Sequence, residues 1–315
     1  MEYRPYGELR DVPHLVVDGS AQPGTRLTLS HWPGADCPEP LRADLSAEIA
    51  FNYLDHPDLH LDVGYVTNNH FDQDGLIGVF ALTRPDDARP YRDRLIDIAR
   101  AGDFSRFHHR DAARAAIAIA ALGAAAGGDD PYPAVLHDVR RLATAVETFR
   151  ELWADEDAHI TETERAIADG TITITEEPEL DLAIVRVPDD WHARTVHRFT
   201  TTATGAAHPY AVYNATDRFA VLTLAGGAPE LRDRYETWVH YTSRRPRPRV
   251  DLTDLAAELT RAEPAGRWVF DGVEALSPAL HFEGDTTAIT DETFVTLVRE
   301  TLTEARTIWS PYPSG

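Results

Sequence analysis

The sequence predicts an α/β fold: a mostly parallel sheet covered by helices, followed by a second, smaller α+β lobe. In residues 1–130, short apolar runs alternate with stretches whose apolar residues recur at helical spacing. From residue 171 onward, short alternating strands dominate instead. At 315 residues with 43% apolar content, the chain is long enough to bury a sizeable core and to form two lobes.

The first predicted domain, residues 1–130, begins with a strand–helix–strand unit. Apolar runs at 15–17 and 27–29 predict two strands. Residues 45–54 predict a helix because their apolar positions recur at helical intervals, and residues 62–66 return as a strand. Further helices are expected to start at Leu76 and to cover residues 92–101, where Gly102 ends the helix, and 111–125.

A helical connector is predicted over residues 131–170, with Gly170 at its end. The second predicted domain, residues 171–315, is the α+β substrate lobe. Its expected strands are 171–175, 182–187, 210–213, 219–224 and 235–242, with a strand into a turn at 268–272, and its expected helices are 252–261 and 291–305.

Composition and charge exclude several function classes. The formal net charge of −22 argues against nucleic acid as a bulk partner, because binding to phosphates depends on Lys and Arg. All 30 cationic residues are Arg, which excludes a Schiff-base or P-loop lysine. Cys37 is the only cysteine, so intrachain disulfides and thiolate metal clusters are ruled out. Without a signal-like N-terminus or a run of about 18 apolar residues, we expect a cytoplasmic protein with no membrane partner.

The most informative segment runs from Thr67 to Gly75, where His70, Asp72 and Asp74 alternate between two apolar runs. Residues at alternate positions of an extended chain point to the same side, so these three could bind one divalent cation. An EF-hand loop is excluded, because the site of its bidentate glutamate is occupied by alanine. Asp74 alone could instead cap the following helix.

Other candidate ligands follow the predicted strands, where open α/β sheets place their sites. Asp18 follows the first strand, His31 follows the second, and Asp103 ends a helical stretch. We expect Asp18 and Asp103 to join the metal site, and one of His31, His108 and His109 to assist proton transfer. Oxygen and imidazole donors favour Mn²⁺, with Mg²⁺, Fe²⁺ or Zn²⁺ as alternatives. The two neighbouring histidines could also simply line an exposed helix start.

The strongly basic segment of this acidic chain is Ser243 to Arg249. Because arginine grips phosphate and carboxylate groups in a bidentate manner, we expect this segment to bind an anionic substrate. The alternative is a solvated loop, or one paired with surface carboxylates. The substrate-binding candidates are Arg244, Arg245, Arg247 and Arg249.

The His70-Phe71-Asp72-Gln73-Asp74 segment resembles the opening His-x-Asp-x-Asp signature of the DHH phosphoesterase superfamily. The resemblance covers the N-terminal lobe and implies a two-lobed enzyme that holds two Mn²⁺-like ions and hydrolyses phosphodiesters, cyclic dinucleotides, short oligonucleotides or pyrophosphate. It implies that His70, Asp72 and Asp74 are metal ligands, and that Phe107-His108-His109 stands where the superfamily has Asp-His-His. The whole chain also resembles an actinobacterial family of unknown function, through the segments 30–34 and 101–104.

We therefore expect a metal-dependent, phosphoesterase-like hydrolase in which a metal-bound hydroxide attacks a phosphoester or another small anionic substrate. Two alternatives stay open. One is a non-catalytic binding or scaffold protein on a degenerate DHH-like fold, and the other is a metal enzyme that acts on a non-phosphate substrate such as an amide. A homodimer is one arrangement that the sequence allows.

Overall fold

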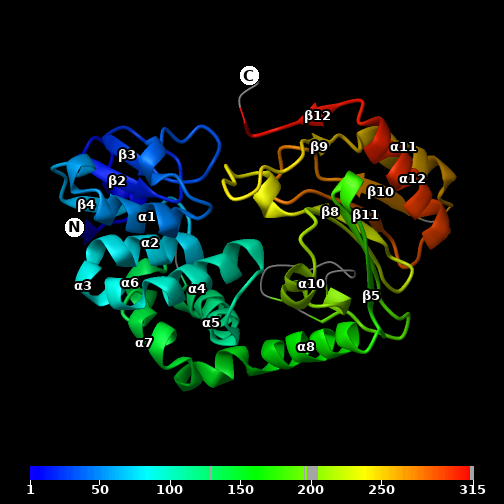
Figure 1. The fold of residues 1–315 in the computed structure, drawn as a ribbon, viewed down its shortest axis with the longest axis horizontal. Helices are drawn as coiled ribbons and strands as arrows, with labels where there is room; N and C mark the ends of the chain where they lie inside the picture. The colour runs from blue at the N-terminus through cyan, green and yellow to red at the C-terminus, as the bar shows by residue number, and fades with distance from the viewer. Residues whose placement is uncertain (128–129, 195, 197–204, 265, 313–315) are drawn as a thin grey trace. The chain divides into compact units, whose positions relative to one another are not determined.

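The computed structural model describes residues 1–127, 130–194, 196, 205–264 and 266–312, and the chain divides into two compact units (Figure 1). The first unit contains residues 1–157 together with 239–245, and the second contains residues 158–238 and 246–315. The division falls inside helix α8 (Arg150–Ala168), within the segment expected to be a connector.

The first unit contains a four-stranded sheet with the strand order β1-β4-β2-β3, in which every neighbouring pair is parallel. The strands are β1 (Glu2–Tyr3), β2 (His14–Val17), β3 (Thr25–Leu29) and β4 (Tyr65–Thr67). Leu15, Val16 and Val17 are completely buried, as expected for a strand covered on both faces. The predicted α/β class with a mostly parallel sheet is confirmed, and β2 and β4 place their carboxyl ends side by side.

Helix α2 (Gln73–Thr83) packs against the sheet and lies between two further helices, α1 (Ser46–Asp55) and α4 (Arg92–Phe104). A Cβ atom on Gly78 of α2 would lie 2.5 Å from Cγ1 of Val17, so the glycine allows a close approach to β2. The other helices are α3 (Pro85–Ala88), α5 (Arg110–Ala126), α6 (Tyr132–Val135) and α7 (Val139–Thr144), with 3₁₀ turns η1 (Tyr6–Glu8), η2 (Glu39–Leu41), η3 (Pro57–Leu59), η4 (Arg89–Tyr91) and η5 (Val146–Phe149).

One predicted boundary in this unit is wrong: α4 does not end at Gly102 but continues to Phe104. A Cβ atom on Gly102 would lie 2.5 Å from Cβ of Gln73, so the glycine serves close packing of α4 on α2. The helix ends where Ser105 takes a left-handed conformation, with φ of 52°. Asp103 therefore lies in the last turn of α4.

The second unit contains a six-stranded mixed sheet with the order β10-β11-β8-β7-β6-β5, in which only β6 and β7 run parallel. The core beside this sheet includes Trp268, whose ring stacks on Phe294 with centroids 4.6 Å apart. The strands are β5 (Thr173–Glu177), β6 (Leu182–Arg186), β7 (Ala220–Leu224), β8 (Glu230–Asp233), β10 (Arg267–Phe270) and β11 (Ala279–Glu283), with the pair β9 (Arg249–Val250) and β12 (Ile308–Trp309). The helices are α10 (Pro209–Ala215), α11 (Thr253–Ala262) and α12 (Asp291–Glu304), with 3₁₀ turns η6 (Pro178–Leu180) and η7 (Tyr235–Thr237).

Two predicted strands are wrong. Residues 210–213 lie in α10, because Pro209 occupies its first turn and the His208 ring accepts a hydrogen bond from the Tyr210 N–H at 3.1 Å. Residues 235–242 form η7 and then irregular chain, in which the N–H of His240 donates to the carbonyl of His31 at 2.8 Å. Short runs of apolar and aromatic residues misled the prediction in both segments. Among the described residues, no helix has the length and apolar character that crossing a membrane requires.

Candidate metal centre

Six ionisable side chains lie near one another at the carboxyl edge of the parallel sheet. Parallel strands bring the residues that follow them to one edge, where two neighbouring helices also end or begin. The group, here called the cluster, consists of Asp18 after β2, His31 after β3, His70 and Asp72 after β4, Asp74 in the first turn of α2, and Asp103 in the last turn of α4. All six were candidate site residues in the sequence, and the structure brings them together.

Asp18 joins the two halves of the cluster. Its Oδ2 atom lies 3.3 Å from Nε2 of His70, and its Oδ1 atom lies 3.4 Å from Nε2 of His31. Its backbone is left-handed, with φ of 47°, a conformation that Asp and Asn adopt more readily than most residues. Two triplets can each hold a cation by geometry, an outer one (Asp18, His70, Asp72) and an inner one (Asp18, His31, Asp74), with ligand atoms within 4.8 Å of one another.

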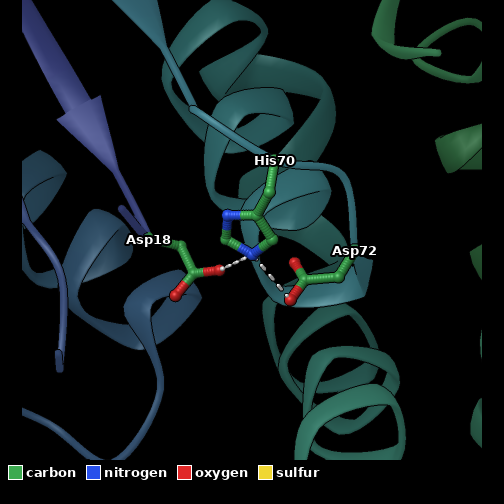
Figure 2. Close-up of side chains that lie close together, drawn as sticks. All are labelled: Asp18, His70 and Asp72. Carbon is green, nitrogen blue, oxygen red and sulfur yellow. Dashed lines mark hydrogen bonds and ion pairs between the residues drawn. The ribbon is translucent and has the colours of Figure 1, made fainter. Parts of the chain in front are cut away.

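The outer triplet is partly open to solvent. Figure 2 shows the His70 ring between the two carboxylates, with Nε2 also 3.1 Å from Oδ2 of Asp72. The side chains of His70 and Asp72 are 32% and 24% exposed. Asp72 caps α2, since its Oδ1 accepts the Gly75 N–H at 2.9 Å, and the Trp32 ring stacks on His70 at 5.1 Å. One carboxylate oxygen of Asp72 is therefore committed to the helix, and the other faces the imidazole.

The inner triplet is buried and tied to the start of α1. Both oxygens of Asp74 accept backbone N–H groups, from Ser46 at 2.7 Å and from Ala47 at 2.8 Å. The Ser46 hydroxyl donates to Oδ1 of Asp18 at 2.8 Å. Asp74 therefore satisfies N–H groups at the start of α1, a different helix from its own, whereas Asp72 caps α2, the helix in which Asp74 lies.

His31 is oriented by its second nitrogen. Its Nδ1 atom lies 2.5 Å from the carbonyl oxygen of Asp44, so a proton on Nδ1 would leave Nε2 directed at the carboxylates. Besides Asp18, Nε2 lies 3.9 Å from Oδ2 of Asp74 and 3.6 Å from Oδ2 of Asp103. One imidazole nitrogen is thus surrounded by three buried carboxylates.

The cluster raises the proton affinity of both imidazoles. Burial by itself lowers the pKa of His31, but the neighbouring carboxylates of Asp18 and Asp74 raise it to about 10. Burial likewise opposes the charged form of His70, and Asp72 together with Asp18 raises its pKa to about 11. Without another cation, the two rings supply positive charge to the carboxylates.

The two central carboxylates respond in opposite directions. Burial would raise the pKa of Asp18, but its contacts with His31 and His70 outweigh burial and hold the pKa below its usual range. Burial, followed by the charge of Asp18, raises the pKa of Asp74 to about 8. The cluster therefore retains protons where a bound divalent cation would supply the same compensation.

His108 and His109 do not join this cluster. Their backbone N–H groups donate to the two carboxylate oxygens of Asp97, at 2.8 and 2.9 Å. Both histidines line a separate pocket of about 330 Å³ formed with residues of α4, α5 and α7, and its lining includes no residue of the cluster. Their position at the start of α5, with both residues exposed, agrees with the alternative that they line an exposed helix start.

The four arginines of the basic segment are divided between the units, with Arg244 and Arg245 in the first and Arg247 and Arg249 in the second. Arg247 donates to backbone carbonyls of the second unit, and Arg249 is almost completely buried. The acceptors of Arg249 are the hydroxyl of Thr237 and the carbonyls of Val273, Ala275 and Leu276. Arg247 thus binds carbonyls of η6 and α12, and Arg249 binds carbonyls of irregular backbone.

Several residues that support the cluster were missed in the sequence: Asp44, Ser46, Asn68 and Tyr132. Asp44 and Ser46 lie at the start of the predicted helix 45–54, where acidic and hydroxyl side chains are typical of a helix N-terminus. Asn68 lies inside the informative segment 67–75 and could have been noticed there. Tyr132 lies in a Pro-rich break, and no local pattern links it to the cluster.

Comparison with curated proteins and with solved structures found no match. One protein family does match, over residues 1–313, and it is described as a family of unknown function, DUF6687. Since the match covers nearly the whole chain, this protein belongs to the DUF6687 family.

Proposed function

We propose that this protein is a metal-dependent hydrolase whose divalent cations bind the cluster. The observation that carries the proposal is Asp18, whose two oxygens face two different imidazoles and so belong to two cation-competent triplets. Carboxylate and imidazole donors without thiolates suit Mn²⁺, and also Mg²⁺, Fe²⁺ or Zn²⁺.

The burial of the cluster supports this assignment. The side chains of Asp18, Asp74 and Asp103 are at most 1% exposed, and grouped buried carboxylates are costly unless positive charge compensates them. The protons held by His31 and His70 provide that charge in the metal-free protein, and a cation can replace them. The residues present therefore fit a hard or borderline divalent ion.

A divalent cation at this position would lower the pKa of a water molecule and polarise a substrate oxygen, which is the chemistry of hydrolysis. His70 and Asp72 line the solvent-exposed side, so a substrate would approach the outer triplet. His31 is buried, and we assign it to cation binding instead of proton transfer. His108 and His109 have no part in this mechanism.

We further propose that the substrate is a phosphoester or another small anion, on a DHH-like first unit. The support is the His70-x-Asp72-x-Asp74 segment after a strand of a parallel sheet, together with Asp18 after the neighbouring strand. Anionic oxygens are the natural ligands of hard cations, which favours such a substrate over a neutral one.

The test combines metal analysis with a substrate screen. Purified protein is expected to contain Mn, Fe or Zn by elemental analysis, and to hydrolyse bis(p-nitrophenyl) phosphate with added Mn²⁺ but not a p-nitroanilide amide. The double variant His70→Ala/Asp72→Ala should lose this activity, and a control variant at the exposed Asp58, Asp58→Asn, should keep it. Activity on the amide alone would redirect the proposal to non-phosphate substrates. A protein that binds no divalent cation would refute it.

A further inference from the structure

A buried polar pair, Asn68 and Tyr132, lies beside the outer triplet. Asn68 follows β4, and Tyr132 begins α6. A Cβ atom on Gly75 would lie 2.0 Å from Nδ2 of Asn68, 2.7 Å from the hydroxyl oxygen of Tyr132 and 3.2 Å from Oδ1 of Asp72. The three polar atoms therefore surround one point at the start of α2.

The hydrogen-bond donors of Asn68 and Tyr132 are poorly satisfied. The Asn68 amide faces the Tyr132 hydroxyl, but neither the Asn68 Nδ2 nor the Tyr132 oxygen completes a hydrogen bond of good geometry within the described part of the chain. Burying donors in this state is unfavourable, so a purely structural explanation would favour apolar residues here. Oδ1 of Asn68 accepts the His70 N–H at 3.0 Å, which orients the Asn68 amide nitrogen toward Tyr132.

Aromatic packing fixes the place of the Tyr132 hydroxyl. The ring stacks on Tyr3, with centroids 4.7 Å apart and planes 23° apart. Phe71, which lies between His70 and Asp72 in the chain, meets the same ring edge-on at 5.3 Å. These two ring contacts hold the hydroxyl beside Asp72.

We propose that Asn68 and Tyr132 are positioning residues for Asp72, an inference that rests on the proposed cation site. Oδ1 of Asp72 accepts the Gly75 N–H at 2.9 Å, and Oδ2 faces His70. The buried amide and hydroxyl dipoles on the Oδ1 side oppose rotation of the carboxylate and keep Oδ2 directed at His70, where a cation would bind. Groups that orient ligands in this way affect metal affinity by about 10- to 100-fold in other proteins.

The test compares two hydroxyl deletions in one ring stack. Tyr132→Phe removes the hydroxyl beside Asp72, and the control Tyr3→Phe removes the stacked hydroxyl that donates to Asp130 at 2.7 Å. We expect Tyr132→Phe to weaken Mn²⁺ binding at least about tenfold in isothermal titration calorimetry, and Tyr3→Phe to stay within about twofold of the unsubstituted protein. Asn68→Ala, which removes the amide without adding negative charge beside the cation site, should also weaken binding.

Each outcome can be assigned. If the unsubstituted protein binds no Mn²⁺, the proposed function fails. If it binds Mn²⁺ and both Tyr132→Phe and Asn68→Ala bind equally well, the positioning role is overturned while the cation site stands. Equal losses of Mn²⁺ affinity in Tyr132→Phe and Tyr3→Phe would also overturn the positioning role, because a disturbed stacking of the two rings would explain both losses. Thermal unfolding in EDTA completes the test, since a merely structural role would lower the metal-free Tm without changing affinity.

Discussion

The inner and outer triplets share Asp18 but differ in their surroundings. In the inner triplet the imidazole is completely buried, and both oxygens of Asp74 hold the backbone of α1. In the outer triplet the imidazole is 32% exposed, and Asp72 holds only the start of its own helix. The inner triplet therefore stabilises the fold, whereas the outer triplet is partly accessible to solvent.

This difference separates two contributions that a cluster of charged residues usually mixes. A carboxylate that satisfies a second helix stabilises the protein without any cation. A carboxylate and an imidazole at the surface gain little for the fold, so their arrangement points more directly to binding. Experiments on the two triplets should therefore give different results for stability and for metal affinity.

The largest effect is expected for Asp18→Asn, because both triplets lose their shared carboxylate. Asn tolerates the left-handed backbone at this position, so the fold should persist. We expect at least about 100-fold weaker Mn²⁺ binding in calorimetry, with Asp58→Asn unchanged as a control for losing an exposed carboxylate. Retention of both cations by Asp18→Asn would show that Asp18 does not link the triplets.

The second-largest effect is expected for the free energy of unfolding of the metal-free protein, measured in EDTA. Asp74→Ala leaves two buried N–H groups of α1 without their acceptor, so we expect the free energy of unfolding to fall by about 2–4 kcal/mol. Asp72→Ala removes one helix cap and should cost about 1 kcal/mol. Denaturant unfolding of the two variants measures both values, and equal losses would contradict the distinction between the triplets.

The stability of the metal-free protein should fall as pH rises from 7 to 9. The pKa of His31 is raised to about 10 and that of His70 to about 11, because nearby carboxylates outweigh burial. A histidine whose pKa is raised by folding stabilises the folded state fully when the pH is below its unfolded-state pKa of about 6.5. This stabilisation is lost as the pH rises toward the pKa of the folded state. Each proton can contribute at most about 1.4 kcal/mol per pH unit in this window.

Thermal unfolding from pH 7 to 9 in EDTA tests this dependence. His31→Gln and His70→Gln should each flatten the profile, and saturating Mn²⁺ should flatten it further because metal-bound imidazoles carry no dissociable ring proton at Nε2. Superimposable profiles for the two variants and the unsubstituted protein would contradict the assignment of the protons to these rings.

The smallest effect is expected for Trp32→Leu, since Trp32 is not a candidate ligand and its ring stacks on the outer imidazole. A stacked ring contributes about 0.5–1.5 kcal/mol, so Mn²⁺ affinity at the outer triplet should fall by a few-fold. Trp309→Leu, in the second unit, is the matched control. Unchanged Mn²⁺ affinity in Trp32→Leu would contradict a contribution of the stacked ring to the outer triplet.

The six cluster residues could be predicted because each is polar and lies beside an apolar strand or helix. Asp18 follows a strand that is apolar throughout, and His70 to Asp74 lie between two apolar runs, so the local pattern contained the signal. Asn68 was adjacent to this signal, but its role depends on Tyr132, which comes from another helix. A contact between residues far apart in the chain produces no local periodicity from which a single sequence could predict it.

The errors have a similar cause. The apolar and aromatic residues at 210–213 and 235–242 predicted strands, but they reflect burial of a short helix and of irregular chain. His108 and His109 were placed in the site partly by resemblance, whereas Asp97 fixes their backbone elsewhere. Arg249 was expected to meet a substrate, yet its guanidinium satisfies carbonyls that have no strand partner. In each case tertiary contacts overrode the local pattern.

The left-handed backbone at Asp18 has an evolutionary consequence. Asn and Gly adopt this conformation readily, and a single base change converts an aspartate codon into a codon for either residue. Such a change would preserve the turn after β2 while removing the carboxylate that the two triplets share. The fold would then survive the loss of the proposed cation site, so the residue at this position can distinguish relatives that keep both triplets from relatives that keep only the scaffold.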